Sequence, residues 1–166
     1  QAPDVLILQE VDRVAHLNAI AAALETNQPG TDWQQRNINR TNTTTGQSFL
    51  AILTRFPIAN VNHTLLTAEG EVIAACPNHP RLAARAAIGA TITVDGKPFA
   101  VFSTRNEFIS GDCVAAEQNR RFKAWANATY PSVTHLYGGD FNMLPTGQAY
   151  PVITTNPTAI DAWREA

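Results

Sequence analysis

The sequence has few lysines, no long apolar run and no excess of positive charge. Only two of its twelve basic residues are lysine, and the formal net charge is −2. No overall positive field therefore points to a nucleic-acid partner, although a catalytic groove can be basic locally. No apolar segment approaches the roughly 20 residues of a membrane-spanning helix. A strand-like segment follows Gln1 almost at once, so we expect neither a membrane span nor a signal peptide in these residues.

Several familiar site motifs are also missing. We find no glycine-rich phosphate loop, nucleophile elbow or dinucleotide fingerprint. The four histidines have no spacing typical of zinc ligands, and each is more often a surface or core residue. They are His16, His63, His79 and His135. The best-known nucleotide-binding, serine-hydrolase and zinc chemistries are therefore not indicated.

What is present is an ordinary globular composition, with 45% hydrophobic and 16% charged residues in 166 positions. This length predicts one domain with a substantial core. The two cysteines, Cys76 and Cys113, stand in loop-like contexts, and a disulfide and two free thiols are equally open. A disulfide would favour a secreted or periplasmic protein.

The apolar pattern predicts alternating strands and helices. Residues 5–8 form an apolar run typical of a strand covered on both faces, and residues 49–53 form a second. Asp12 is expected to cap the helix between them. The helix should bury one stripe of side chains at helical spacing. Its members are Val14, Leu17, Ile20 and Leu24.

A hairpin is predicted in the middle of the chain. Residues 86–94 alternate between apolar and polar side chains, Asp95-Gly96 is a two-residue turn signal, and residues 97–103 form the returning strand. A helix is expected from about residue 112 to 128, then a strand over 133–137 that Gly138-Gly139 ends. A hairpin set among alternating strands and helices predicts an α/β sandwich with mixed sheets.

Polar residues follow two of these strands and are candidates for chemistry. Glu10 stands at the mouth of the first strand, where a carboxylate can hold a hard cation such as Mg²⁺. Asp140 and Asn142 follow the glycines and can point into one site, where a carboxylate orients water and an amide binds a phosphoryl oxygen. The alternatives are a solvated strand end for Glu10 and an Asx turn for the other two.

Five segments together resemble the endonuclease/exonuclease/phosphatase superfamily, which has the deoxyribonuclease-I-like fold. In the family's order they read PDVLILQEVD, ILTRFPI, RAAIGATITVDGKPFAVFST, GGDFN and IDAWREA. The likeness covers essentially the whole chain. It implies a four-layer α/β sandwich of mixed sheets and a divalent-metal-dependent phosphoester hydrolase.

The resemblance also implies roles for individual residues. Glu10 would bind Mg²⁺ or Mn²⁺, Asp140 would orient or activate the attacking water, and Asn142 would contact the scissile phosphate. Arg85 matches an arginine that would face the substrate, with a structural ion pair as the alternative. The substrate could be DNA or RNA, a phospholipid head group or a small phosphoester.

Two departures from the family pattern bear on activity. Arg105 stands where family members carry histidine; a guanidinium can bind phosphate as a cation but cannot exchange a proton. The family's first strand would precede Gln1, and its C-terminal strands, with the catalytic histidine, would follow Ala166. We therefore expect residues 1–166 to form one incomplete domain with weak or no hydrolysis alone. A catalytically inactive binding module is the alternative, and a homo-oligomer could cover the open sheet edges.

Overall fold

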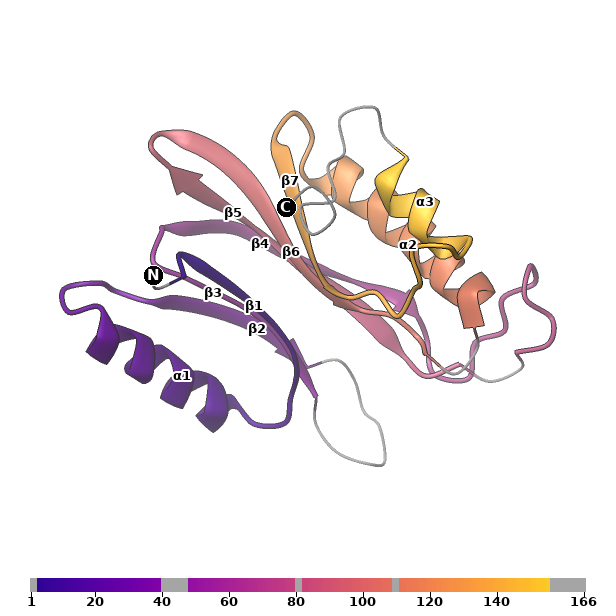
Figure 1. The fold of residues 1–166 in the computed structure, drawn as a ribbon, viewed down its shortest axis with the longest axis horizontal. Coiled ribbons are helices and arrows are strands. Elements are labelled where there is room, and N and C mark those ends of the chain that lie inside the picture. Colours follow the sequence, from indigo (N-terminus) through magenta and orange to yellow (C-terminus); the bar gives the residue numbers. More distant parts are fainter. Residues whose placement is uncertain (1–2, 40–47, 80–81, 109–110, 156–166) are drawn as a thin grey trace.

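The computed structural model describes residues 3–39, 48–79, 82–108 and 111–155, and it has four layers (Figure 1). Two β-sheets pack face to face, with one helix outside the first sheet and two outside the second. The first sheet has the order β1-β3-β2, with bounds β1 Val5–Val11, β3 Phe49–Thr54 and β2 Gln34–Asn39. The second has the order β4-β5-β6-β7, with bounds β4 Ile58–Thr67, β5 Arg85–Val94, β6 Lys97–Arg105 and β7 Thr134–Asp140. The helices are α1 Val14–Asn27, α2 Gly111–Thr129 and α3 Ala149–Thr154. The predicted four-layer α/β sandwich is confirmed.

The core between the two sheets follows the alternation read from the sequence. One face of β5 meets β3, and every residue of β3 is buried. The buried members of this cluster are Leu50, Ile52, Ala86, Ile88, Ala90, Ile92 and Val101. Because side chains alternate along a strand, the opposite face of β5 and β6 is left for α2, where Phe102 packs edge-on against Phe122. The second sheet is therefore covered on both faces.

The predicted hairpin is present, and the second sheet is mixed as expected, whereas the first is antiparallel. Asp95 and Gly96 have φ angles of 50° and 75°, which suit a tight primed turn, and Val94 pairs with Lys97. Strands β6 and β7 are parallel, whereas the other pairs of both sheets are antiparallel. In this part of the chain β1, β2, β4 and β7 are the sheet edges. Oligomerisation through such edges stays a prediction.

Two expectations about helix α1 are wrong. Arg13, not Asp12, is the N-cap residue, and it makes no side-chain capping bond. The Asp12 carboxylate instead lies 2.6 Å from His16 Nδ1, one turn along. Leu17 is fully buried as predicted, but Val14 is 42% exposed.

Strand β7 also differs from its prediction, and the difference positions the candidate site. The glycines do not end the strand: Gly138 pairs with Ser103, Gly139 with Thr104 and Asp140 with Arg105. A Cβ on Gly138 would lie 2.5 Å from Ile7 Cδ1, and one on Gly139 would collide with the Thr104 backbone. Because these two residues have no side chain, β7 can lie close to β1 of the first sheet and to its neighbour β6. Asp140 is then the last paired residue of β7.

Strands β2 and β4 were not predicted as such, and the motif IDAWREA lies outside the described residues. Cys76 and Cys113 form a disulfide, which settles the question that the sequence left open. No helix in the described ranges is long and apolar enough to cross a membrane.

Candidate functional site

Three strand ends bring Glu10, Arg105 and Asp140 together. Arg105 ends β6 and Asp140 ends β7, and the two residues are partners in the parallel ladder. Arg105 Nη2 lies 2.6 Å from Glu10 Oε1, and Arg105 Nε lies 3.5 Å from Asp140 Oδ2. One guanidinium therefore lies between the two carboxylates. Their oxygens are within about 10 Å, the widest separation that one cation with its water shell can link.

Local backbone geometry directs Glu10 toward this place. The register between β1 and β3 shifts after Leu8, and Glu10 has a φ of 57°, in the left-handed region. Such bulges and strained dihedrals are frequent where a functional side chain must be re-aimed. The preceding Gln9 donates to the Ser103 hydroxyl at 3.1 Å, and Ser103 donates to Leu8 O at 3.0 Å. This bridge fixes the end of β1 against β6.

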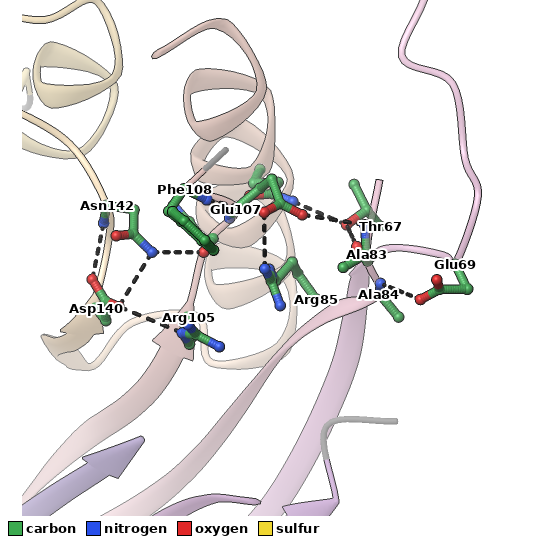
Figure 2. A network of polar contacts seen from close by, with 12 residues as sticks. Thr67, Glu69, Ala83, Ala84, Arg85, Arg105, Glu107, Phe108, Asp140 and Asn142 are labelled. Atoms are coloured by element: carbon green, nitrogen blue, oxygen red, sulfur yellow. Dashed lines mark hydrogen bonds and ion pairs between the residues drawn. The ribbon is translucent and has the colours of Figure 1, made fainter. Parts of the chain in front are cut away.

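Asp140 and Asn142 form a tight turn beside the guanidinium (Figure 2). Asn142 has a φ of 47°, and its backbone N–H donates to Asp140 Oδ1 at 3.2 Å. The Asx turn, which the sequence offered as the structural alternative for these two residues, is thus present. The Asn142 amide also donates to Asp140 Oδ2 at 3.2 Å and to Asn106 O at 2.8 Å. The Asp140 side chain is 42% exposed and that of Glu10 is 60% exposed, so both carboxylates are accessible.

Two asparagines that the sequence reading missed support this turn. Asn106 is fully buried and donates to Asn119 Oδ1 at 2.6 Å and to Phe141 O at 3.2 Å. Asn119 of α2 is also fully buried and donates to Ala149 O at 3.0 Å. A signal was available, because Asn119 falls on the same helical stripe as Phe122. A polar residue on a buried stripe must be hydrogen-bonded.

Arg85 has a different environment from the other candidates. Its side chain is 4% exposed, and Nη2 lies 2.9 Å from Glu107 Oε1. Arg85 Nε and Nη1 have no hydrogen-bond partner within the described part of the chain. The structure therefore places Arg85 in a buried ion pair away from the Arg105 group (Figure 2). Substrate binding by Arg85 stays a prediction.

The donor set at Glu10 and Asp140 fits a divalent cation. No group of three or more histidine, cysteine, aspartate or glutamate side chains able to hold a metal occurs in the described ranges. Mg²⁺ does not need one, since it is commonly held by one or two carboxylates, with water and substrate phosphate completing its shell. The Arg105 guanidinium lies between the two carboxylates, so positive charge is stable at this position. Glu10 is the residue that would hold the ion, with Asp140 beside it.

Comparison with solved structures defines the fold. The human Nocturnin catalytic domain, with bound sulfate, aligns at a TM-score of 0.67 with 20% identity, over 93% of this chain and 57% of that one. An endonuclease/exonuclease/phosphatase from Bacteroides vulgatus gives 0.68 and 19% identity, with the same coverage. A mannosyl-6-phosphatase from Bacteroides thetaiotaomicron gives 0.65 and 18%, over 90% of this chain and 55% of that one.

The chain therefore has the deoxyribonuclease-I-like fold of the endonuclease/exonuclease/phosphatase superfamily, as the sequence motifs implied. It spans just over half the length of these structures. No protein-family model and no curated protein matches it by sequence. At this level of identity the likeness establishes the fold, and the chemistry rests on the site.

Proposed function

We propose that the chain is part of a divalent-metal-dependent phosphoester hydrolase. The observation that carries this proposal is that Arg105 lies between Glu10 and Asp140 at the ends of three strands, with Asn142 hydrogen-bonded to Asp140. Active sites in layered α/β proteins commonly lie at such strand ends. Two of the similar structures support the reading, since one is a mannosyl-6-phosphatase and another holds sulfate, an analogue of phosphate.

Charge explains why a metal is part of this proposal. Two carboxylates and one guanidinium carry one net negative charge, which repels an anionic phosphoester. A bound divalent ion reverses that sign, polarises a phosphoryl oxygen and stabilises the leaving oxyanion. We propose Glu10 as its principal ligand, with Mg²⁺ or Mn²⁺ as the ion.

The remaining groups act on water and phosphate. Asp140 orients a water molecule and accepts its proton as the oxygen–phosphorus bond forms and the bond to the leaving oxygen breaks. Asn142 contacts the phosphoryl oxygen through the amide N–H that now faces Asp140, while its other N–H stays on Asn106 O. Arg105 binds phosphate as a cation, because a guanidinium can donate two parallel hydrogen bonds to phosphate oxygens.

A catalytically inactive binding module is the second candidate. The observation in its favour is Arg105, which takes both carboxylates and cannot exchange protons as a histidine does. Within the described ranges no histidine contacts Glu10, Asp140 or Asn142. The substrate class, whether nucleic acid, lipid head group or small phosphoester, is equally open under both readings. The disulfide supports a secreted or periplasmic location.

Hydrolysis of bis(p-nitrophenyl) phosphate and p-nitrophenyl phosphate tests the proposal. We expect slow turnover that requires Mg²⁺ or Mn²⁺ and that Asp140→Asn lowers about 10²–10⁴-fold, because a positioned acid–base group contributes that much. Asp32→Asn is the matched control, since Asp32 is an exposed carboxylate elsewhere. Turnover equal in wild type and Asp140→Asn would contradict the proposed role. Phosphate binding without any turnover would favour the binding module.

A further inference from the structure

The guanidinium of Arg105 occupies the position that the two carboxylates offer to a cation. We propose that Arg105 is a resident cation of the site, which competes with a divalent metal for Glu10 and is released to phosphate when the metal binds. This inference rests on the proposed function, because it takes Glu10 as the metal ligand. It assigns to Arg105 a control of metal affinity that a histidine at this position would not exert at neutral pH.

The geometry makes simultaneous occupancy unfavourable. Arg105 Nη2 lies 2.6 Å from Glu10 Oε1, so a divalent ion on the same carboxylate would lie within a few ångströms of the guanidinium. Like charges at that separation repel strongly, and less water screens them because the Arg105 side chain is only 13% exposed. Glu10, by contrast, is 60% exposed and free to accept an ion from solvent. Metal binding therefore requires Arg105 to give up its contact with Glu10.

One donor of Arg105 has no hydrogen-bond partner, which favours this exchange. Arg105 Nε is buried but makes no hydrogen bond, since its 3.5 Å approach to Asp140 Oδ2 lacks hydrogen-bond geometry. A buried N–H without a partner is costly and rare in folded proteins. An oxyanion placed beside Arg105 would satisfy it. The unpaired Nε and the exposed Glu10 together indicate that the guanidinium can exchange its contact with Glu10 for one with an oxyanion.

Coupling between ligands follows from this exchange. Metal at Glu10 frees Nη2 for a phosphoryl oxygen, and phosphate on Arg105 removes the competitor from Glu10. By thermodynamic reciprocity each ligand strengthens the binding of the other. The part of this coupling that Arg105 carries should disappear when its charge is removed.

Mn²⁺ binding tests the inference without any activity assay. The electron-paramagnetic-resonance signal of free Mn²⁺ gives the affinity of the purified chain for the ion. We expect Arg105→Gln to bind Mn²⁺ about ten-fold more tightly than wild type, as the loss of one adjacent positive charge implies. Arg55→Gln is the matched control: Arg55 pairs with Asp4 before the start of β1, so it removes equal charge from the opposite end of the strand.

Further variants separate charge from other effects. Arg105→Lys keeps the charge and should stay near the wild-type affinity, whereas the double variant Glu10→Gln with Arg105→Gln should lose the gain. Inorganic phosphate should tighten Mn²⁺ binding more in wild type than in Arg105→Gln. An Arg105→Gln affinity equal to or weaker than wild type would overturn the inference, and so would the absence of Mn²⁺ binding in every variant.

A measurement on the unmutated chain covers the case in which Arg105→Gln fails to fold. The Nε–Hε resonance of Arg105, assigned by its loss in Arg105→Lys, should shift when Mg²⁺ is added. An unchanged resonance would contradict release of the guanidinium. The two proposals can fail separately: a gain in Mn²⁺ affinity with turnover that Asp140→Asn leaves unchanged supports the inference and contradicts the proposed hydrolase mechanism. Hydrolysis that depends on Asp140, without the gain in Mn²⁺ affinity, does the reverse.

Discussion

Two arginines at strand ends pair with glutamates, and their surroundings differ. Arg85 begins β5 and pairs with Glu107, both side chains being 4% exposed. Arg105 ends β6 and pairs with Glu10, whose side chain is 60% exposed. The same two functional groups thus form one buried pair and one pair whose glutamate is open to solvent.

Hydrogen bonding separates the two pairs further. The Glu107 carboxylate accepts the backbone N–H groups of Ala83 and Phe108 besides the Arg85 guanidinium, and Glu107 N donates to Gln118 Oε1. Glu10 has only Arg105 as an ion-pair partner among the residues that the structure describes. A carboxylate saturated by fixed donors is part of the framework, whereas one held by a single side chain can exchange it for an ion. Burial of the ion pair and saturation of the carboxylate with hydrogen bonds therefore distinguish a structural pair from a candidate site pair better than residue type does.

The largest effect should come from breaking the buried pair. Glu107→Gln keeps the size of the side chain but leaves the Arg85 charge buried without a counter-ion, which typically costs about 3–5 kcal/mol. Glu10→Gln, the matched break of the open pair, should cost less than about 1 kcal/mol. The free energy of unfolding by urea measures both. Equal losses in the two variants would remove the distinction between framework and site.

The disulfide provides a second test of the comparison, because it cross-links the region around the buried Arg85–Glu107 pair. Cys76 lies in the segment between β4 and β5, which also contains Ala83, whose N–H donates to Glu107. Cys113 lies in the first turn of α2. The bridge closes a loop with a sequence separation of 37, so Cys76→Ser with Cys113→Ser should lower stability by about 2–4 kcal/mol.

The same double variant should leave the open pair unchanged. The bridge contacts neither Glu10 nor Asp140, so Mn²⁺ affinity should remain within about two-fold of wild type at a temperature where the variant is folded. Thermal unfolding and the Mn²⁺ titration check the two halves of this prediction. A large loss of Mn²⁺ affinity in a folded variant would show that the two regions are coupled.

The sequence predicted the parts of the fold that local patterns determine. Alternation over residues 86–94 and the Asp95-Gly96 turn identified the hairpin, because strand period and turn chemistry depend only on neighbouring residues. The strand β2 was missed, since Gln34–Asn39 is a mostly polar run that forms a strand by pairing with buried β3. Local strand propensity does not predict tertiary pairing of this kind.

For the candidate site, the motifs named residues that the structure brings together but did not show how they meet. Glu10, Asp140 and Asn142 come together, yet their relation through Arg105 depends on the β6–β7 register. Gly138 and Gly139 were interpreted as a break because glycine usually ends a strand, and here they allow a close approach instead. Asn106 escaped notice because its partners are distant in sequence. Such contacts follow from packing rather than from spacing.

The smallest expected effect concerns an ion pair of intermediate burial, between Arg121 and Glu71. Their side chains are 36% and 27% exposed, and Arg121 Nη1 lies 2.7 Å from Glu71 Oε1. The backbone N–H of Ala68 lowers the pKa of Glu71 below its usual 4.5; burial opposes this shift, and Arg121 reinforces it. Glu71 therefore binds protons less readily in the folded chain than in the unfolded one. Its contribution to stability is present above about pH 4.5 and is lost as the pH falls through the folded pKa.

Glu71→Gln should accordingly destabilise the chain near pH 7 by less than about 1 kcal/mol, since solvent screens a partly exposed pair. The difference from wild type should shrink as the pH falls below about 4.5 and the wild-type carboxylate takes up a proton. Urea unfolding across this range measures it, with Glu25→Gln on the exposed side of α1 as the matched loss of a carboxylate. A difference that grows toward low pH would reverse the sign of the linkage. A loss of unfolding free energy near that of Glu107→Gln would show that partial burial is enough to make an ion pair structural. The distinction between the Arg85 and Arg105 pairs would then apply only at a higher exposed fraction.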